Sequence, residues 1–266
     1  MRRINKSTVI WVSALLTLTA AVASATPSPN GAYIQTRLFN DCPGSTVGVT
    51  NSYPASVRIS DQNMGCVGFA NLHIWRFSED GGTTAAVFNN DACFRAAATL
   101  RLTGAGEGEA GLQVAPWWSA SDGRFNVRTT DGEIACFGGR MPFYNFSGAP
   151  HMLRYTRGTD IRLEVIYSPN GLSMASPATI EYKVTYNAIT YSSGVLSFDE
   201  GNPAEDPPYG RWGMLNDGRV GGHFQYFVAQ SGANALEASW SDIVFEQCIV
   251  GVEPSTWSKM KGLYKN

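Results

Sequence analysis

The side chains of this sequence that could do chemistry on a ligand are carboxylates and histidines in alternating, strand-like segments. Hydrolysis of a glycosidic bond needs two carboxyl groups about 5–10 Å apart across that bond. Glu164 and Glu181 both occupy the polar phase of such segments, so neighbouring strands could bring them together. The alternative is an outer sheet face, with Glu164 beside Arg162 and Glu181 beside Lys183. His223 is a third candidate, but no Ser or Cys motif accompanies it, so a nucleophilic triad is not indicated.

Aromatic and amide side chains suggest binding rather than catalysis. A flat indole stacks on the apolar face of a sugar ring, and polar neighbours then hydrogen-bond to its hydroxyl groups. Alternation places Asn126 in phase with Arg128, and His223 in phase with Gln225. The alternative is that some of the tryptophans belong to the core, where we expect Trp75 and Trp240. The predicted ligand-binding residues are Gln113, Trp117, Trp118, Asn126, Arg128, Trp212, Asn216, His223 and Gln225.

Five cysteines indicate disulfides, with at least one thiol left over in each chain: Cys42, Cys66, Cys93, Cys136 and Cys248. Because the two ends of a β-sandwich often lie side by side, we expect Cys42 to pair with Cys248. The second expected pair is Cys66 with Cys93. No C-x-x-C motif is present and the three histidines are distant from the cysteines, so the sequence predicts no zinc site.

The sequence predicts no cofactor, although a structural calcium ion is a further hypothesis. Its candidate ligands are Asp80, Asn90, Asp91 and Asp242. None of them belongs to an EF-hand-like run, and the same residue types serve turns equally well.

Alternation of apolar and polar residues predicts the elements that would position these side chains. The clearest strands are 160–167 (DIRLEVIY) and 179–186 (TIEYKVTY). Residues 94–118 should form two strands joined by a tight glycine-rich turn, and Asp131-Gly132 should close a second hairpin. Further predicted strands cover residues 56–60, 71–78, 85–88, 189–196, 212–215, 221–228 and 238–245. This pattern predicts an all-β fold, a two-sheet antiparallel sandwich.

The ends of the chain differ from its body. Residues 1–25 combine Arg2, Arg3 and Lys6 with an apolar run and a small-residue site, which predicts a cleaved signal peptide. We expect a loose leader over 26–37, the sandwich over 38–250 and a tail over 251–266 that forms a short helix. No segment of the mature chain is apolar enough to span a membrane. A net charge of −2 argues against a nucleic-acid partner.

The strand order resembles that of the concanavalin A-like lectin/glucanase jelly rolls, including laminin-G-like modules. The segments that carry the resemblance are FRAAATLRLTG, GEAGLQVAPWW, GRFNVRTTDGEIACFGG, DIRLEVIY and SWSDIVFEQ, within about Phe39 to Gln247. The resemblance implies two stacked sheets, with a sugar-holding groove on the concave one. The Glu-x-Asp-x-Glu run of the glucanases is missing. Arg162-Leu163-Glu164 has the Arg-x-Glu spacing of alginate-lyase-like members, but their other elements are not seen.

Together these features predict a non-catalytic carbohydrate-binding or surface-associated protein, with a polysaccharide or glycan as its partner. The alternative is a glycoside hydrolase or lyase using Glu164 with Glu181 or His223, so the sequence leaves open whether the protein is an enzyme. A third hypothesis is an assembly protein that docks a partner through a sheet edge or the tail. The signal peptide, and a tail like those of exported bacterial proteins, predict a secreted or cell-surface location in a bacterium.

Overall fold

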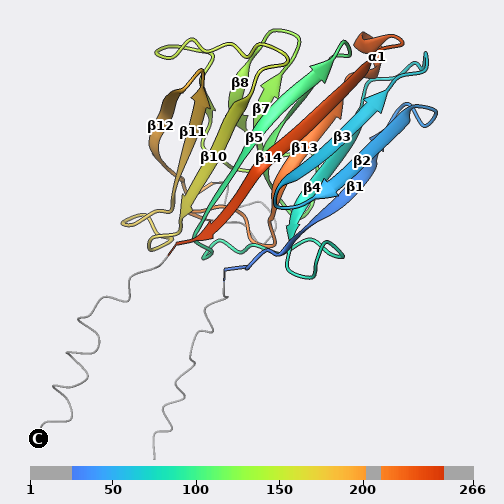
Figure 1. The fold of residues 1–266 in the computed structure, drawn as a ribbon. Coiled ribbons are helices and arrows are strands. Elements are labelled where there is room, and N and C mark those ends of the chain that lie inside the picture. Colours follow the sequence, from blue (N-terminus) through green and yellow to red (C-terminus); the bar gives the residue numbers. More distant parts are fainter. Residues whose placement is uncertain (1–25, 202–210, 249–266) are drawn as a thin grey trace, which may run out of the picture.

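A computed structural model describes residues 26–201 and 211–248 as two stacked antiparallel sheets of seven strands each (Figure 1). The first sheet runs in the order β1 (Gly31–Asn40), β4 (Asn71–Ser78), β13 (Arg219–Tyr226), β6 (Gly108–Ala115), β7 (Arg124–Arg128), β8 (Ile134–Phe137) and β9 (Tyr144–Asn145). The second runs β12 (Ile189–Ser197), β11 (Thr179–Tyr186), β10 (Ile161–Ser168), β5 (Phe94–Gly104), β14 (Ala235–Gln247), β3 (Ser56–Gln62) and β2 (Thr46–Ser52). The predicted two-sheet sandwich is confirmed.

The core lies between the two sheets and is built from alternate residues of each strand. In β10, Ile161, Leu163 and Val165 are buried, whereas the residues between them face outward. Trp75 of β4 and Trp240 of β14 are both fully buried, and their rings meet edge to face with centroids 6.1 Å apart. The core positions predicted for these two tryptophans are therefore confirmed.

The predicted hairpin over residues 94–118 is wrong, although both of its strands exist. β5 pairs with β10 and β14 in the second sheet, whereas β6 pairs with β13 and β7 in the first. The glycine-rich segment between them therefore carries the chain from one sheet to the other. Gly104 has φ +105°, and a Cβ on Gly106 would lie 2.8 Å from the Tyr226 ring. Alternation identifies a strand and its faces, but it does not identify the neighbouring strand.

Two other hairpins agree with the sequence. β7 pairs with β8 across the Asp131-Gly132 turn, and β11 pairs with β12. Asn187 and Ala188, which join β11 to β12, have φ of +52° and +61°. Two consecutive positive φ values are typical of a type I′ hairpin turn, which suits the twist of the flanking strands.

Several predicted boundaries need correction. The leader does not extend to residue 37, because β1 already begins at Gly31 and pairs with β4. β2 is an unpredicted strand, residues 85–88 contribute only an isolated bridge at Phe88, and residues 212–215 form a turn. The described residues contain one helix, α1 (Val228–Ser231), and it is too short to span a membrane. The predicted signal peptide and helical tail lie outside the described residues.

The expected disulfide pairing is also wrong. Cys42 pairs with Cys66, and Cys93 pairs with Cys248, while Cys136 is a buried free thiol. Cys42 follows β1 and Cys66 precedes β4, so two paired strands of the first sheet bring them together. Cys93 and Cys248 flank the register pair Phe94 and Gln247 of β5 and β14. Two disulfides are consistent with an extracellular location.

Candidate functional site

The outward face of the first sheet carries a buried layer of polar side chains. Ala110, Leu112 and Val114 of β6 point into the core, so Glu109 and Gln113 point outward. The register aligns their neighbours in rows across β13, β6 and β7. One row joins Gln225, Glu109 and Arg128, the next joins His223, Gly111 and Asn126, and the third joins Gly221, Gln113 and Arg124.

These side chains form one hydrogen-bonded network. Glu109 forms an ion pair with Arg124 and accepts a hydrogen bond from Asn126 Nδ2 at 2.9 Å. Arg124 Nη2 also donates to Gln225 Oε1 at 2.6 Å. His223 Nε2 lies 2.9 Å from Asn126 Oδ1, reaching it across Gly111, which has no side chain to intervene. Because Asn126 uses its amide N–H toward Glu109, its oxygen accepts, and His223 carries its proton on Nε2.

Burial and neighbouring positive charge keep His223 neutral. Its side chain is fully buried, which lowers its pKa well below the usual value, and the charges of Arg124 and Arg76 lower the pKa further. Burial also lowers the pKa of Arg124, although the nearby Glu109 carboxylate opposes that shift. The network therefore contains a neutral imidazole, one carboxylate and its paired guanidinium.

Side chains of this layer hold the loop of residues 116–122, which connects β6 to β7. Gln113 Nε2 donates to the carbonyl oxygens of Ala120 at 2.9 Å and Asp122 at 2.7 Å. Arg124 Nε donates to Ser121 O at 2.5 Å. These contacts fix a loop whose Trp118 side chain stays 45% exposed. Gln113 itself is buried beneath this loop.

An aromatic groove opens beside the loop on the same sheet face. Its first pocket, of about 450 Å³, has Trp118, Phe39, Phe69 and Leu72 in its walls and Arg124 and Gln225 at its polar side. A second pocket of about 260 Å³ shares Phe69 and includes Arg128, Thr130, Phe227 and Gln230. We call the two pockets together the aromatic groove. Aromatic walls with a few fixed polar groups are typical of sugar-binding sites.

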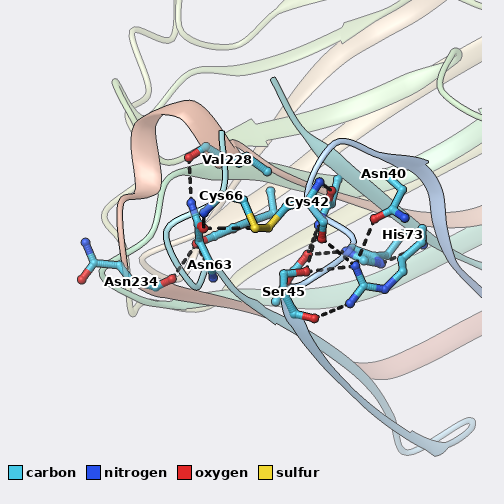
Figure 2. The surroundings of a disulfide bond; sticks show 12 residues. Asn40, Cys42, Ser45, Asn63, Cys66, His73, Val228 and Asn234 are labelled. Carbon is cyan, nitrogen blue, oxygen red and sulfur yellow. Dashed lines mark hydrogen bonds and ion pairs between the residues drawn. A yellow bond between two sulfur atoms is a disulfide. The ribbon is translucent and has the colours of Figure 1, made fainter. Parts of the chain in front are cut away.

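The part of the groove formed by Phe69 is held by a carboxylate and by the Cys42–Cys66 disulfide. Figure 2 shows this disulfide and its surroundings. Asp41 Oδ2 accepts hydrogen bonds from the backbone N–H of Phe69 at 2.7 Å and of Ala70 at 3.1 Å. Next to it, Cys42–Cys66 joins the end of β1 to the loop that carries Phe69. Asn63 Oδ1 accepts a hydrogen bond from Cys66 N at 2.8 Å. Phe69 is 64% exposed, but its own backbone N–H and that of Ala70 are both held by Asp41.

A buried His–Asp pair lies behind the same wall and has a structural role. His73 Nε2 is 3.0 Å from Asp61 Oδ2, and His73 Nδ1 accepts from Arg37 N at 3.2 Å. Burial raises the pKa of Asp61, but hydrogen bonds from His73, Asn71 and Ser45 outweigh burial and hold it below the usual value. Both nitrogens of His73 are thus engaged, and neither is left to activate a serine.

The structure brings most, but not all, of the predicted ligand-binding residues to one face. Trp118, Arg128 and Gln225 line the aromatic groove. Trp117 is exposed beside Trp118, with ring centroids 5.5 Å apart. The predicted direct contact with sugar does not fit three residues that share this face but are buried below it: Gln113, Asn126 and His223.

Trp212 and Asn216 do not belong to the groove. Trp212 O accepts a hydrogen bond from Ala178 N at the start of β11, in the second sheet. Asn216 Oδ1 accepts from Asn90 N at 2.8 Å. Conversely, sequence reasoning missed Phe39, Phe69 and Arg124. Arg124 is in phase with Asn126 and could have been found by alternation, whereas the two phenylalanines carry no such signal.

Glu164 and Glu181 lie on the outward face of the second sheet, away from His223 on the first. Glu164 forms an ion pair with Arg95, and Lys183 Nζ lies 4.0 Å from Glu164 and 3.4 Å from Glu181. Both glutamates therefore lie beside cations on an outward sheet face, which is the alternative role considered for them. The pairing of Glu164 with His223 as catalytic partners is contradicted, because the sandwich lies between them.

The carboxylate of Asp80, a candidate calcium ligand, closes a turn. It accepts hydrogen bonds from Ser78 Oγ at 2.6 Å and from the backbone N–H groups of Thr83 and Thr84, both at 2.9 Å. Among the described residues, no cluster of three or more His, Cys, Asp or Glu side chains could hold a metal ion. The described residues therefore provide no set of ligands that supports the calcium hypothesis.

No protein-family model matches this chain, and a search of the curated proteins found no match. The solved structures to which it is similar include a seed lectin of Lotus tetragonolobus, with 9% identity, a TM-score of 0.41, and 84% of this chain and 96% of that one covered. Lectin I of Ulex europaeus has 14% identity and a TM-score of 0.42, covering 82% and 93%. An alginate lyase of Zobellia galactanivorans has 11% identity and a TM-score of 0.38, covering 74% and 80%.

The likeness is one of fold alone. The two seven-stranded antiparallel sheets form the β-sandwich that the sequence predicted. With identities of at most 14% and TM-scores of at most 0.42, these structures indicate no family for this chain.

Proposed function

We propose that this protein is a secreted or cell-surface glycan-binding protein, and that the aromatic groove is its binding site. The observation that carries the proposal is the pairing of exposed aromatic walls, Trp118 and Phe69, with the fixed polar groups of Arg124 and Gln225. Rigid support of both walls favours binding, because little conformational freedom is lost when the ligand arrives.

Binding is favoured over hydrolysis by the state of the carboxylates near the groove. Glu109 is engaged by Arg124 and Asn126, while Asp131 and Glu133 both form ion pairs with Arg128. A hydrolase needs one carboxyl group free to give a proton and a second free to attack or to activate water. A polysaccharide-acting enzyme remains the second candidate, since the neutral His223 network lies directly below the groove.

The decisive experiment is titration calorimetry of the mature protein against glycans first identified on an array. Phe69→Ala and Trp118→Ala should each weaken binding about tenfold or more, which corresponds to about 1.4 kcal/mol. Phe143→Ala is a matched control, because Phe143 is 68% exposed but lies in a different pocket. Wild-type affinity in both groove variants would refute the proposed site. Release of products from a bound polysaccharide would instead favour the enzyme.

A further inference from the structure

Arg76 is a buried cation without a carboxylate partner in the described part of the chain. It projects from β4 onto the outward face of the first sheet and is only 2% exposed. Its guanidinium donates to three carbonyl oxygens: Trp75 O at 3.3 Å, Gly222 O at 3.1 Å and Ala120 O at 3.3 Å. Arg124, which is similarly buried, has Glu109 as its counter-charge.

A second arginine adds to this unbalanced charge. Arg219 lies on β13, two residues from Gly221, the register partner of Arg76. It donates to the carbonyl oxygens of Asp217 at 2.7 Å and Gly218 at 3.1 Å, and no described carboxylate forms an ion pair with it. Burial, together with the charge of Arg219, lowers the pKa of Arg76 to about 9. Buried charges in proteins are almost always paired with an opposite charge. A bound anion would therefore stabilise this pair of arginines.

The aromatic groove is the place where such an anion would bind. Ala120, whose carbonyl oxygen Arg76 holds, lines the first pocket together with Arg124. The residues lining this pocket include no aspartate or glutamate. An anionic group bound against the loop would therefore contact Arg124. It would also be attracted by the charge of Arg76, which is buried and therefore little screened by water.

We propose that the glycan bound in the aromatic groove is acidic, and that its carboxylate or sulfate groups are attracted by Arg76, Arg124 and Arg219. This inference rests on the proposed glycan-binding function and adds the chemical class of the ligand. A neutral glycan would leave the positive charge of Arg76 and Arg219 without a counter-charge among the described residues. An acidic one would give that charge a partner.

The test compares polymers that differ only in charge. Polygalacturonate and its fully methyl-esterified form probe carboxylates, while dextran sulfate and dextran probe sulfates. The wild-type protein should bind at least one acidic polymer about tenfold or more tightly than its neutral counterpart. This preference should shrink several-fold between 50 mM and 500 mM NaCl, because salt screens charges near the surface. Comparison of the two acidic polymers tells carboxylate from sulfate.

Arg219→Gln is the informative variant, because Arg219 is half-buried and does not hold the loop. It should weaken binding of the acidic polymer about fivefold and leave binding of a neutral one unchanged. Arg101→Gln is the control, since Arg101 forms its ion pair with Asp160 on the outward face of the second sheet.

Three results would overturn the inference. If a neutral polymer binds as tightly as its acidic form, and loses affinity in Trp118→Ala, the groove is confirmed but the acidic ligand is wrong. If the acidic polymers bind equally well to the wild type and to Arg219→Gln, Arg219 does not attract the ligand and the inferred arginine cluster is wrong. Failure of every polymer and of the wider array to bind would refute the proposed function together with the inference.

Discussion

At the scale of single residues, the polar layer beneath the groove shows that a residue's face and its accessibility are separate questions. Alternation correctly places Gln113, Asn126 and His223 on one face with Gln225. The loop of residues 116–122 then covers part of that face, and Gln113 uses its amide to hold the loop. Gln113 is therefore a positioning residue for Trp118 rather than a sugar contact.

His223 should make the protein less stable at mildly acidic pH. An unfolded histidine has a pKa of about 6.5, whereas burial and the charges of Arg124 and Arg76 lower the pKa in the folded protein well below that value. The unfolded state therefore binds more protons below about pH 6.5, and stability is lost as the pH falls. This loss approaches about 1.4 kcal/mol for each pH unit between the unfolded and folded pKa values.

Urea unfolding between pH 7.5 and pH 5.5 checks this prediction. His223→Gln can still donate a hydrogen bond to Asn126 but does not titrate, so its free energy of unfolding should vary less with pH. Carboxylates contribute little to the difference, because most of their titration lies below this range. Parallel pH profiles of the two proteins would show that His223 is not the group responsible.

At the scale of elements, the two walls of the groove depend on different supports. The Trp118 loop is held by side chains of β4, β6 and β7, through Arg76, Gln113 and Arg124. The Phe69 wall is held by Asp41 and by the Cys42–Cys66 disulfide. The side chains that hold the Trp118 loop belong to strands inside the sheet. The disulfide that holds the Phe69 wall joins a strand end to a loop. The disulfide should therefore be easier to remove without disturbing the sandwich.

Replacing both cysteines of the first disulfide should weaken ligand binding more than it disturbs the fold. In Cys42→Ser/Cys66→Ser, the loop that carries Phe69 gains freedom that binding must remove, so we expect affinity to fall about tenfold. Calorimetry measures the affinity, and circular dichroism should still report an all-β protein with cooperative unfolding. Unchanged affinity in this variant would mean that Asp41 alone holds the wall.

For the whole molecule, the first and last described residues lie at the same end of the sandwich (Figure 1), where the second disulfide also lies. Gln247 Nε2 donates to Thr26 O at 2.7 Å and to Pro27 O at 2.9 Å, beside the Cys93–Cys248 bond. This disulfide links residues 155 positions apart, whereas Cys42–Cys66 spans 24. A cross-link over a longer loop restricts the unfolded chain more.

Cys93→Ser/Cys248→Ser should therefore lower the free energy of unfolding by about 2–4 kcal/mol, and by more than the Cys42–Cys66 double variant does. Its affinity for the glycan should equal that of the wild type, because neither cysteine lines the groove. Denaturant unfolding under non-reducing conditions measures the first quantity and calorimetry the second. A larger stability loss in the Cys42–Cys66 variant would contradict this ranking.

Local patterns in the sequence were enough to predict the features that depend on neighbouring residues. The two-residue period of β10 and β11 revealed strands and their faces, Asp131-Gly132 revealed a hairpin, and apolar context revealed Trp75 and Trp240 as core. The all-β class and a shared polar face on β6, β7 and β13 followed from the same short-range pattern.

Only the tertiary structure decided which strands are neighbours and what covers each face. It placed β5 and β6 in different sheets, paired Cys42 with Cys66, and brought Phe39, Phe69 and Trp118 to one pocket. The side-chain period is local, whereas strand partners and loop positions depend on contacts between segments far apart in the chain. For that reason the polar face could be predicted, but the groove above it could not.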